Sequence, residues 1–344
     1  MKKITIKDVA EAAGVSYVTV SNVINGKGRM TDKTRDKVRA CIQKMNFHLD
    51  DSARTLASGK SNTIVFISSY LTSPFVTGIL EGVERQLFDT GNSELTLTHN
   101  STKGSNATKQ KLINDMIYGK KADAVIMLTI KPDDSQINEF KKAGIPLVLI
   151  ESSYVLGANT IRLDNYKGGY VAVDYLLKKG KRKIAVICGP FGPSAEGEPE
   201  SSSVTERYKG YKAALKDNGV EFDKSLTYNI KYYIQEEGVK LLDTMLGEHK
   251  DIDAIFCAAG DMVALGIIYR AKQLGKRIPQ DISIVGYDDI TIAGFLNPPL
   301  TTIRQPLDTM GRKAFDLAMD MLKGKTKGAH EILIMPELVI RESA

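Results

Sequence analysis

The chain has 344 residues, of which 42% are hydrophobic and 26% are charged. This length predicts two or more domains, and the composition is typical of a soluble globular protein. The longest apolar runs, such as ADAVIMLTI, have the length of a buried strand, which excludes a membrane span and a membrane partner. The first residues, MKKITIKDVAEAAG, lack the apolar segment of a secretion signal, so we expect a cytoplasmic protein.

The reactive residue types are scattered. Cys41, Cys188 and Cys257 lie among apolar neighbours without a CxxC spacing, which predicts buried free thiols and no metal site. None of the four histidines has an HExxH-like partner, and no GxSxG occurs. We therefore expect no enzyme activity and no cofactor.

The net charge is concentrated at one end of the chain. Residues 1–60 contain 12 Lys and Arg and 6 Asp and Glu, so they carry the whole net charge of +6. The remaining residues contain 35 of each sign. A basic segment before a neutral body points to a polyanion such as nucleic acid as its partner, with a merely solvated basic surface as the alternative.

Three helical segments fit within the first 45 residues. Thr5, followed three residues later by Asp8, predicts a capped start for the first helix. Gly14 breaks that helix, Ser16 can cap the second, and Thr31 starts the third. A helix, a glycine-containing turn and a second short helix predict a helix-turn-helix.

The second helix, within GVSYVTVSNVING, has apolar residues on one side only. Val20, Val23 and Ile24 recur at spacings of three and four, and the other side is mostly polar. In a helix-turn-helix that side lies in the DNA major groove, where donors and acceptors read base edges. A three-helix bundle with a solvated face is the alternative. We predict base contacts from Tyr17, Val18 and Asn22, phosphate contacts from Ser16, Thr19, Ser21 and Asn25, and further DNA contacts from Thr5 and Arg29.

The segment ITIKDVAEAAGVSYVTVSNVINGKGRMTDKTRDKV resembles the DNA-binding head of the lactose/galactose-repressor (LacI/GalR) family of bacterial transcription regulators. Later blocks, including ERYKGYKAAL, ISIVGYDD and PPLTTIRQP, extend the resemblance over essentially the whole chain. It implies a repressor that binds a pseudo-palindromic operator in double-stranded DNA as a homodimer, controlled by a small sugar-like effector. Many members have arginine where this chain has Asn22. Because arginine prefers guanine and asparagine prefers adenine, we expect a different operator base there.

Residues 46–61, NFHLDDSARTLASGKS, resemble the hinge that in this family folds as a short helix on DNA. The resemblance makes Leu56 the side chain that wedges between central base pairs of the minor groove. Ala53 and Ala57 would allow close approach, and Arg54 would meet a phosphate.

From Asn62 onward, short apolar strand-like runs alternate with helical patterns, which predicts an α/β fold with parallel sheets. The series breaks near residue 162, and the resemblance implies a periplasmic-binding-protein-like core of two doubly wound subdomains. We expect a helix-turn-helix head at 1–45, a hinge at 46–61 and a core at 62–344. The N-subdomain is expected at 62–162 and 291–322, and the C-subdomain at 163–290 and 323–344. The expected strands are TIVFISS, ELTLTH, ADAVIMLTI, PLVLIE, NTIRL, KIAVICG, LTYNIK, AIFCAAG and ISIVGYD.

A sugar requires planar polar groups for its hydroxyls and an aromatic ring for its C–H face. The resemblance assigns effector contacts to Arg207 and Asp288, and Glu151 stands where many members have aspartate. Gly260 replaces the usual asparagine, so the ligand is either larger here or lacks one hydroxyl. Asp261 is expected to orient its loop more than to bind ligand. The complete predicted set is Ser69, Tyr70, Phe75, Glu151, Arg207, Gly260, Asp261 and Asp288.

Several alternatives remain open at the level of the sequence. The Ser-, Glu- and Gly-rich segment 192–206 is either a disordered loop or a lid beside Arg207. A regulator of the same family whose main effector is a phosphoprotein is the first alternative function. A transport-type sugar-binding protein is more remote, because it would need a signal peptide and no basic head.

Overall fold

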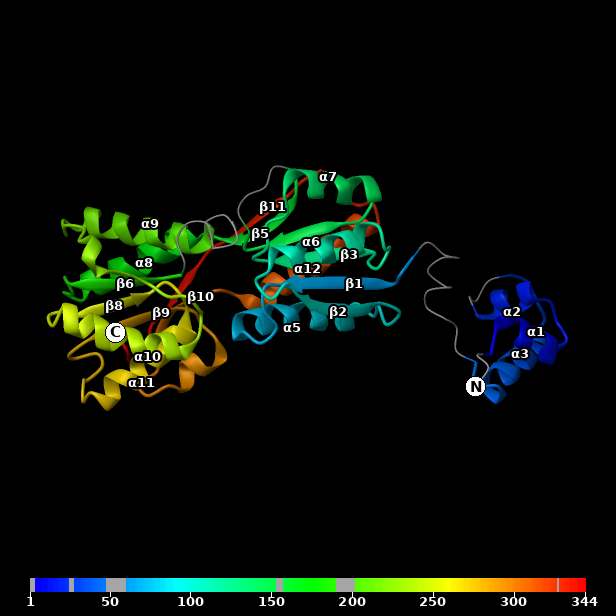
Figure 1. Ribbon diagram of the computed structural model, residues 1–344, viewed down its shortest axis with the longest axis horizontal. Coiled ribbons are helices and arrows are strands. Elements are labelled where there is room, and N and C mark those ends of the chain that lie inside the picture. The colour runs from blue at the N-terminus through cyan, green and yellow to red at the C-terminus, as the bar shows by residue number, and fades with distance from the viewer. Residues whose placement is uncertain (1–3, 25–27, 48–59, 153–156, 190–201, 327) are drawn as a thin grey trace. The chain divides into compact units, whose positions relative to one another are not determined.

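The computed structural model describes residues 4–24, 28–47, 60–152, 157–189, 202–326 and 328–344. The chain divides between Ser61 and Asn62 into a head and a core (Figure 1). Within the described residues, no helix combines the length and the apolar character that crossing a membrane requires. The three cysteines are free; Cys188 and Cys257 are buried as expected, while Cys41 is partly buried.

The head is a three-helix bundle with a helix-turn-helix, as the sequence predicts. The Thr5 hydroxyl accepts a hydrogen bond from the Asp8 amide, and the Asp8 carboxylate accepts one from the Thr5 amide, so both ends of a capping box form. Gly14 ends the first helix in the left-handed region, with φ of 64°, where glycine has no steric penalty. The helices are α1 (Ile6–Ala13), α2 (Tyr17–Ile24) and α3 (Asp32–Lys44).

The first subdomain of the core is a six-stranded sheet in the order β11-β5-β4-β3-β1-β2, with every pairing parallel. Helices α5 and α12 cover one face, and α6 and α7 cover the other. The central strands β1, β3 and β4 read as nearly continuous apolar runs because both faces of the sheet are buried there. The elements are β1 (Thr63–Ser68), α5 (Pro74–Asp89), β2 (Thr96–Ser101), α6 (Asn106–Ile117), β3 (Ala124–Leu128), α7 (Asp134–Ala143), β4 (Leu147–Ile150), β5 (Asn159–Leu163), α12 (Leu307–Leu322) and β11 (Glu331–Ile334).

The second subdomain repeats this three-layer plan. Its sheet has the order β12-β10-β9-β8-β6-β7 and is parallel except at β12. Helices α8 and α9 cover one face, and α10 and α11 cover the other. The elements are α8 (Asn165–Lys178), β6 (Ile184–Cys188), α9 (Ser202–Asp217), β7 (Thr227–Asn229), α10 (Gln235–Glu248), β8 (Ala254–Cys257), α11 (Asp261–Gln273), β9 (Ser283–Asp288), β10 (Thr301–Arg304) and β12 (Glu337–Val339), with short 3-10 turns at Lys224–Leu226 and Thr291–Phe295.

The two later subdomain boundaries differ from those expected. Strand β10 pairs with β9, so residues 291–304 belong to the second subdomain and not to the first. Strand β11 pairs with β5, so the first subdomain continues to Ile334 and does not end at 322. The chain therefore crosses between β5 and α8, between β10 and α12, and between β11 and β12. Nothing local in a four-residue strand specifies which of two sheets it will join.

The end of the segment predicted as a loop at 192–206 is helical instead. Residues 202–206 form the first turns of α9, and residues 192–201 lie outside the described part of the chain.

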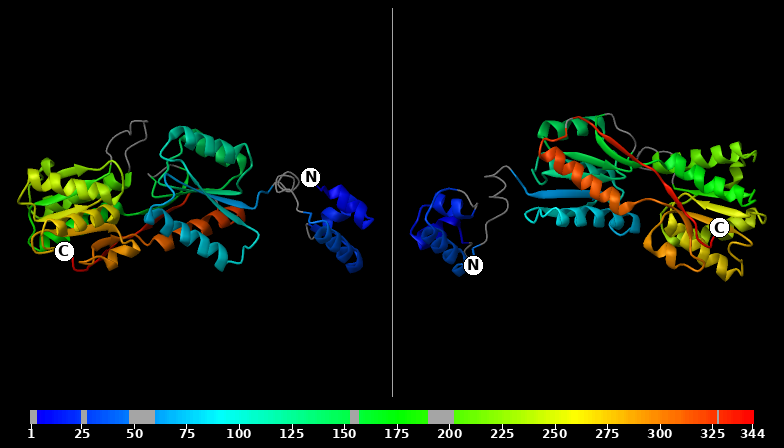
Figure 2. Two further views of the ribbon diagram at one scale, coloured as in Figure 1. Left: turned by 60° about the horizontal axis from the view of Figure 1, so that its bottom comes forward. Right: turned by 180° about the vertical axis from the view of Figure 1, so that it is seen from behind.

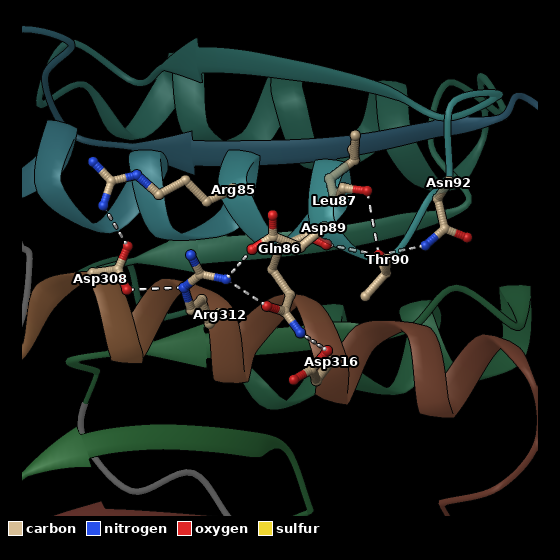
Figure 3. A network of polar contacts seen from close by, with 9 residues as sticks. All are labelled: Arg85, Gln86, Leu87, Asp89, Thr90, Asn92, Asp308, Arg312 and Asp316. Carbon is tan, nitrogen blue, oxygen red and sulfur yellow. Dashed lines mark hydrogen bonds and ion pairs between the residues drawn. The ribbon is translucent and has the colours of Figure 1, made fainter.

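Helices α5 and α12, more than 200 residues apart in sequence, lie side by side on the first sheet (Figures 1 and 2). A side chain at Gly82 would collide with the Asp308 carbonyl, and one at Gly311 with the Ile79 carbonyl, so the two backbones touch. Arg312 then joins the helices by donating to Asp308 on its own helix and to Gln86 and Asp89 on α5 (Figure 3).

Candidate DNA-contacting helix and ligand site

Helix α2 presents its predicted DNA face to solvent. Val20 and Val23 are buried, whereas Tyr17 is 59% exposed and Val18 is 48% exposed. The Ser16 hydroxyl accepts a hydrogen bond from the Thr19 amide at 3.1 Å, which caps the helix start. Two large unburied side chains at the start of a capped helix are suited to reading base edges.

The other predicted DNA contacts fall in different surroundings. Asn22 is partly buried, and its amide nitrogen lies close to Gly28, where an added Cβ would approach it to 3.1 Å. Arg29 is exposed, Ser21 is partly buried, and the Thr5 hydroxyl is engaged with Asp8. Residues Asn25, Ala53, Arg54, Leu56 and Ala57 lie outside the described residues.

The core contains one buried arginine, Arg207 on α9, among its described arginines. Its Nε donates to the Asn165 side-chain oxygen at 2.8 Å, and its Nη1 donates to the Ala258 carbonyl at 2.9 Å. Its guanidinium lies 3.6 Å from the ring centroid of Tyr287, a cation–π contact. These two hydrogen bonds use Nε and Nη1 and not Nη2, so the fixed guanidinium retains donors for a ligand oxygen.

Asp288 ends β9 beside this arginine. Burial raises the pKa of Asp288 to about 6, while the positive charge of Arg207 and a hydrogen bond from Gln305 act in the opposite direction. The Gln305 amide donates to one carboxylate oxygen at 2.6 Å. The other oxygen lies next to Gly260, where an added Cβ would approach it to 2.8 Å. Gly260 has φ of 112°, so both the backbone and Asp288 favour glycine there.

Asp261 and Glu151 use their carboxylates within the protein. Asp261 accepts from the Ile290 amide at 3.0 Å and from the Thr302 hydroxyl at 2.7 Å, and burial raises its pKa well above the ordinary value. Glu151 accepts from the Leu163 amide, from the Asn165 side chain at 2.8 Å and from the Ser203 hydroxyl at 2.9 Å. A polar cavity of about 10 Å³ beside Glu151 has room for about one water molecule and not for a sugar.

Three predicted residues belong to the first subdomain, at the carboxyl end of β1. The carbonyls of Ser69 and Tyr70 accept hydrogen bonds from the Ser101 and Ser68 hydroxyls, which fix the turn after the strand. Tyr70 is 53% exposed, whereas Phe75 packs partly into the core at the start of α5. These contacts join the turn to β1 and β2, not to Arg207.

Sequence reasoning missed Asn165, Tyr287, Gln305 and Tyr233. Tyr233 precedes α10, and its hydroxyl occupies the space that a side chain at Gly189 would need. Burial of that hydroxyl raises the pKa of Tyr233 to about 12, with Arg207 opposing the shift and Asp288 adding to it. Gly189 directly follows strand β6, and a glycine at that place in the sequence was a signal that another side chain could lie close to the backbone there. Among the described residues, no group of three His, Cys, Asp or Glu side chains could hold a metal ion.

The head and the core each match a known protein family. Residues 5–50 match the model described as "Bacterial regulatory proteins, lacI family", and residues 173–344 match a periplasmic binding protein-like domain. The transcriptional repressor PurR of Proteus mirabilis (strain HI4320) is 32% identical over 348 residues, which cover 98% of this chain and 96% of that protein.

Several solved structures cover nearly the whole chain, including two that contain a bound small molecule. One is the lac repressor dimer bound to operator and the anti-inducer ONPF, which is 26% identical with a TM-score of 0.83 and 99% of each chain covered. The other is a complex of the transcriptional regulator CelR with cellobiose, which is 28% identical with a TM-score of 0.72; the match covers 99% of this chain and 100% of that one.

Proposed function

This chain belongs to the LacI family of bacterial regulatory proteins and is a DNA-binding transcriptional regulator, and we propose that it is a repressor controlled by a small sugar-like effector. Its dimer would bind a pseudo-palindromic operator in the cytoplasm. The effector would bind at Arg207 and Asp288, near the crossings between the two subdomains. The observation that carries this proposal is the buried, fixed guanidinium of Arg207 beside a carboxylate.

The proposal that the chain binds an operator depends on the head. Its exposed Tyr17 and Val18 lie at the amino end of α2, next to the Ser16 cap, and residues 1–60 carry all of the net positive charge. One head suits half of a pseudo-palindrome, so two chains are needed. The lac repressor structure similar to this chain is a dimer on its operator.

A sugar-like effector fits the donors and acceptors at the site. Arg207 supplies N–H donors in a fixed plane, Asp288 supplies an acceptor, and the partly exposed ring of Tyr233 can lie against an apolar face. The CelR structure similar to this chain holds cellobiose. The missing asparagine at Gly260 is explained by the backbone and by Asp288, so it does not require a larger ligand.

A phosphoprotein effector is less well supported. Recognition of a phosphoserine uses arginines that are free to form a cluster. All nine arginines of the core are described, and seven of them form ion pairs with aspartate or glutamate, so a phosphate would have to displace a carboxylate from each. A transport protein or an enzyme would not need the head, and the relatives above carry the names of regulators.

The experiment is a thermal-shift screen of the full-length chain against cellobiose, other mono- and disaccharides, and sugar phosphates. We expect at least one compound to raise the melting temperature. At a concentration of 100 times its Kd, it should increase the free energy of unfolding by about 2.7 kcal/mol. Arg207→Ala should abolish the shift. Arg270→Ala, which removes a partly exposed arginine paired with Asp243, should leave it unchanged. If no sugar or sugar phosphate produces a shift, the sugar-like effector is contradicted.

A further inference from the structure

We propose that Asn165 is a positioning residue that fixes the Arg207 guanidinium and links it to Glu151 of the first subdomain. This inference rests on the proposed role of Arg207 as an effector contact. Asn165 is the first residue of α8 and lies just after β5, at the first crossing between the subdomains.

The Asn165 side chain is 6% exposed, and both ends of its amide are satisfied. Its nitrogen donates to Glu151 at 2.8 Å and to the Leu163 carbonyl at 3.2 Å. Its oxygen accepts from Arg207 Nε at 2.8 Å and from the Tyr287 hydroxyl at 3.1 Å. One amide therefore joins a carboxylate of the first subdomain to the guanidinium of the second.

The side-chain amide meets two opposite demands with two separate atoms. The Glu151 side requires a donor, and the Arg207 side requires an acceptor. Aspartate would place a second carboxylate against Glu151, and an apolar residue would remove one hydrogen bond from each of two buried charged groups, Glu151 and Arg207.

The residues after Asn165 are adapted to the same arrangement. A side chain at Gly168 would collide with the Tyr287 hydroxyl, and one at Gly169 with the Arg207 carbonyl. The two glycines let α8 approach α9 and β9 closely enough for one side chain to reach both Tyr287 and Arg207. The block DNYKGGY thus serves the arginine that lies about 40 residues later.

The test follows the Nε–H group of Arg207 by NMR in full-length protein labelled with ¹⁵N-arginine, without any ligand. Its signal is assigned by its loss in Arg207→Lys. We expect Asn165→Ala to accelerate exchange of this proton with water at least about tenfold, because a buried bond to a charged donor is lost. Asn165→Asp retains the acceptor, so exchange should be no faster than in the unsubstituted protein, even though repulsion from Glu151 lowers the melting temperature.

Asn159→Ala is the matched control. Asn159 is 4% exposed and bonds to Met321 and to the His330 amide, both in the first subdomain. Equal acceleration in Asn159→Ala and Asn165→Ala would reduce the effect to general destabilisation and overturn the proposal. An unchanged exchange rate in Asn165→Ala would also overturn the proposal. Faster exchange in Asn165→Asp would overturn it as well, and this variant decides the question if Asn165→Ala does not fold. Because no effector is added, a failed sugar screen leaves this result intact.

Discussion

Replacing Gly311 by alanine tests the direct contact between α5 and α12. In an unobstructed helix interior, alanine is about 1 kcal/mol more favourable than glycine. At position 311 the added Cβ would collide with the Ile79 carbonyl oxygen. The same Cβ would lie 2.8 Å from the Val83 nitrogen and 2.9 Å from the Gly82 α-carbon. All three are backbone atoms, so a side-chain rotation cannot relieve the overlap.

The two helices would have to separate by roughly 1 Å, which loosens the apolar layer that includes Ile79, Met310 and Phe315. Overpacking of this kind costs about 1–3 kcal/mol, and contact with backbone belongs at the upper end of that range. After the gain in helix propensity, we expect a net loss of about 2 kcal/mol and a fall in melting temperature of roughly 4–8 °C.

Differential scanning calorimetry of the full-length chain measures this difference. Gly247→Ala is the matched control, because Gly247 also lies in a helix but has nothing within 4 Å of an added Cβ. That variant should melt at the same temperature or higher. If Gly311→Ala is stabilised as much as Gly247→Ala, the backbones of α5 and α12 are not in contact and the packing argument is refuted.

Three further changes have definite expected outcomes. Ser16→Ala removes the acceptor for the Thr19 amide and should destabilise the head by about 1 kcal/mol, measured by circular dichroism melting; an unchanged melt would contradict the cap. Asn22→Arg should change the preferred operator base from adenine to guanine in a binding-site selection, and selection of the same base by both proteins would refute a base contact. Asp288→Asn tests how protonation of Asp288 affects stability. The pKa of Asp288 is about 6 in the folded protein and 3.8 ordinarily, so between these pH values the folded state binds more protons than the unfolded state. Urea unfolding should therefore show that the stability of the unsubstituted protein, relative to Asp288→Asn, increases as the pH falls from 7 through 6 towards 4. The opposite slope would mean that Arg207 outweighs burial at this carboxyl.

Much of the fold follows from local patterns in the sequence. The nine strands expected from the sequence are all present. The central ones, such as β1, β3 and β4, are recognisable because a strand buried on both faces must be apolar along its length. The capped starts predicted at Thr5 and Ser16 also form, because a hydroxyl and an amide three residues apart need no distant partner. The roles assigned to Arg207 and Asp288 came from motif resemblance and stay predictions.

Only the tertiary structure decided which sheet each late strand joins and how Arg207 is fixed. Strands β10, β11 and β12 alternate between the two sheets within 40 residues. Their short sequences do not specify a partner, so the pairing depends on which sheet edge the folded chain brings next to each strand. Asn165 and Gly169 of α8 and Tyr287 of β9 meet at Arg207 of α9, so three segments far apart in the sequence build this arrangement. The sequence determined which segments become helices and strands because those depend on near neighbours. The contacts between segments depend on the packed core, in which Gly169, Gly311 and the buried Arg207 each meet residues far along the chain.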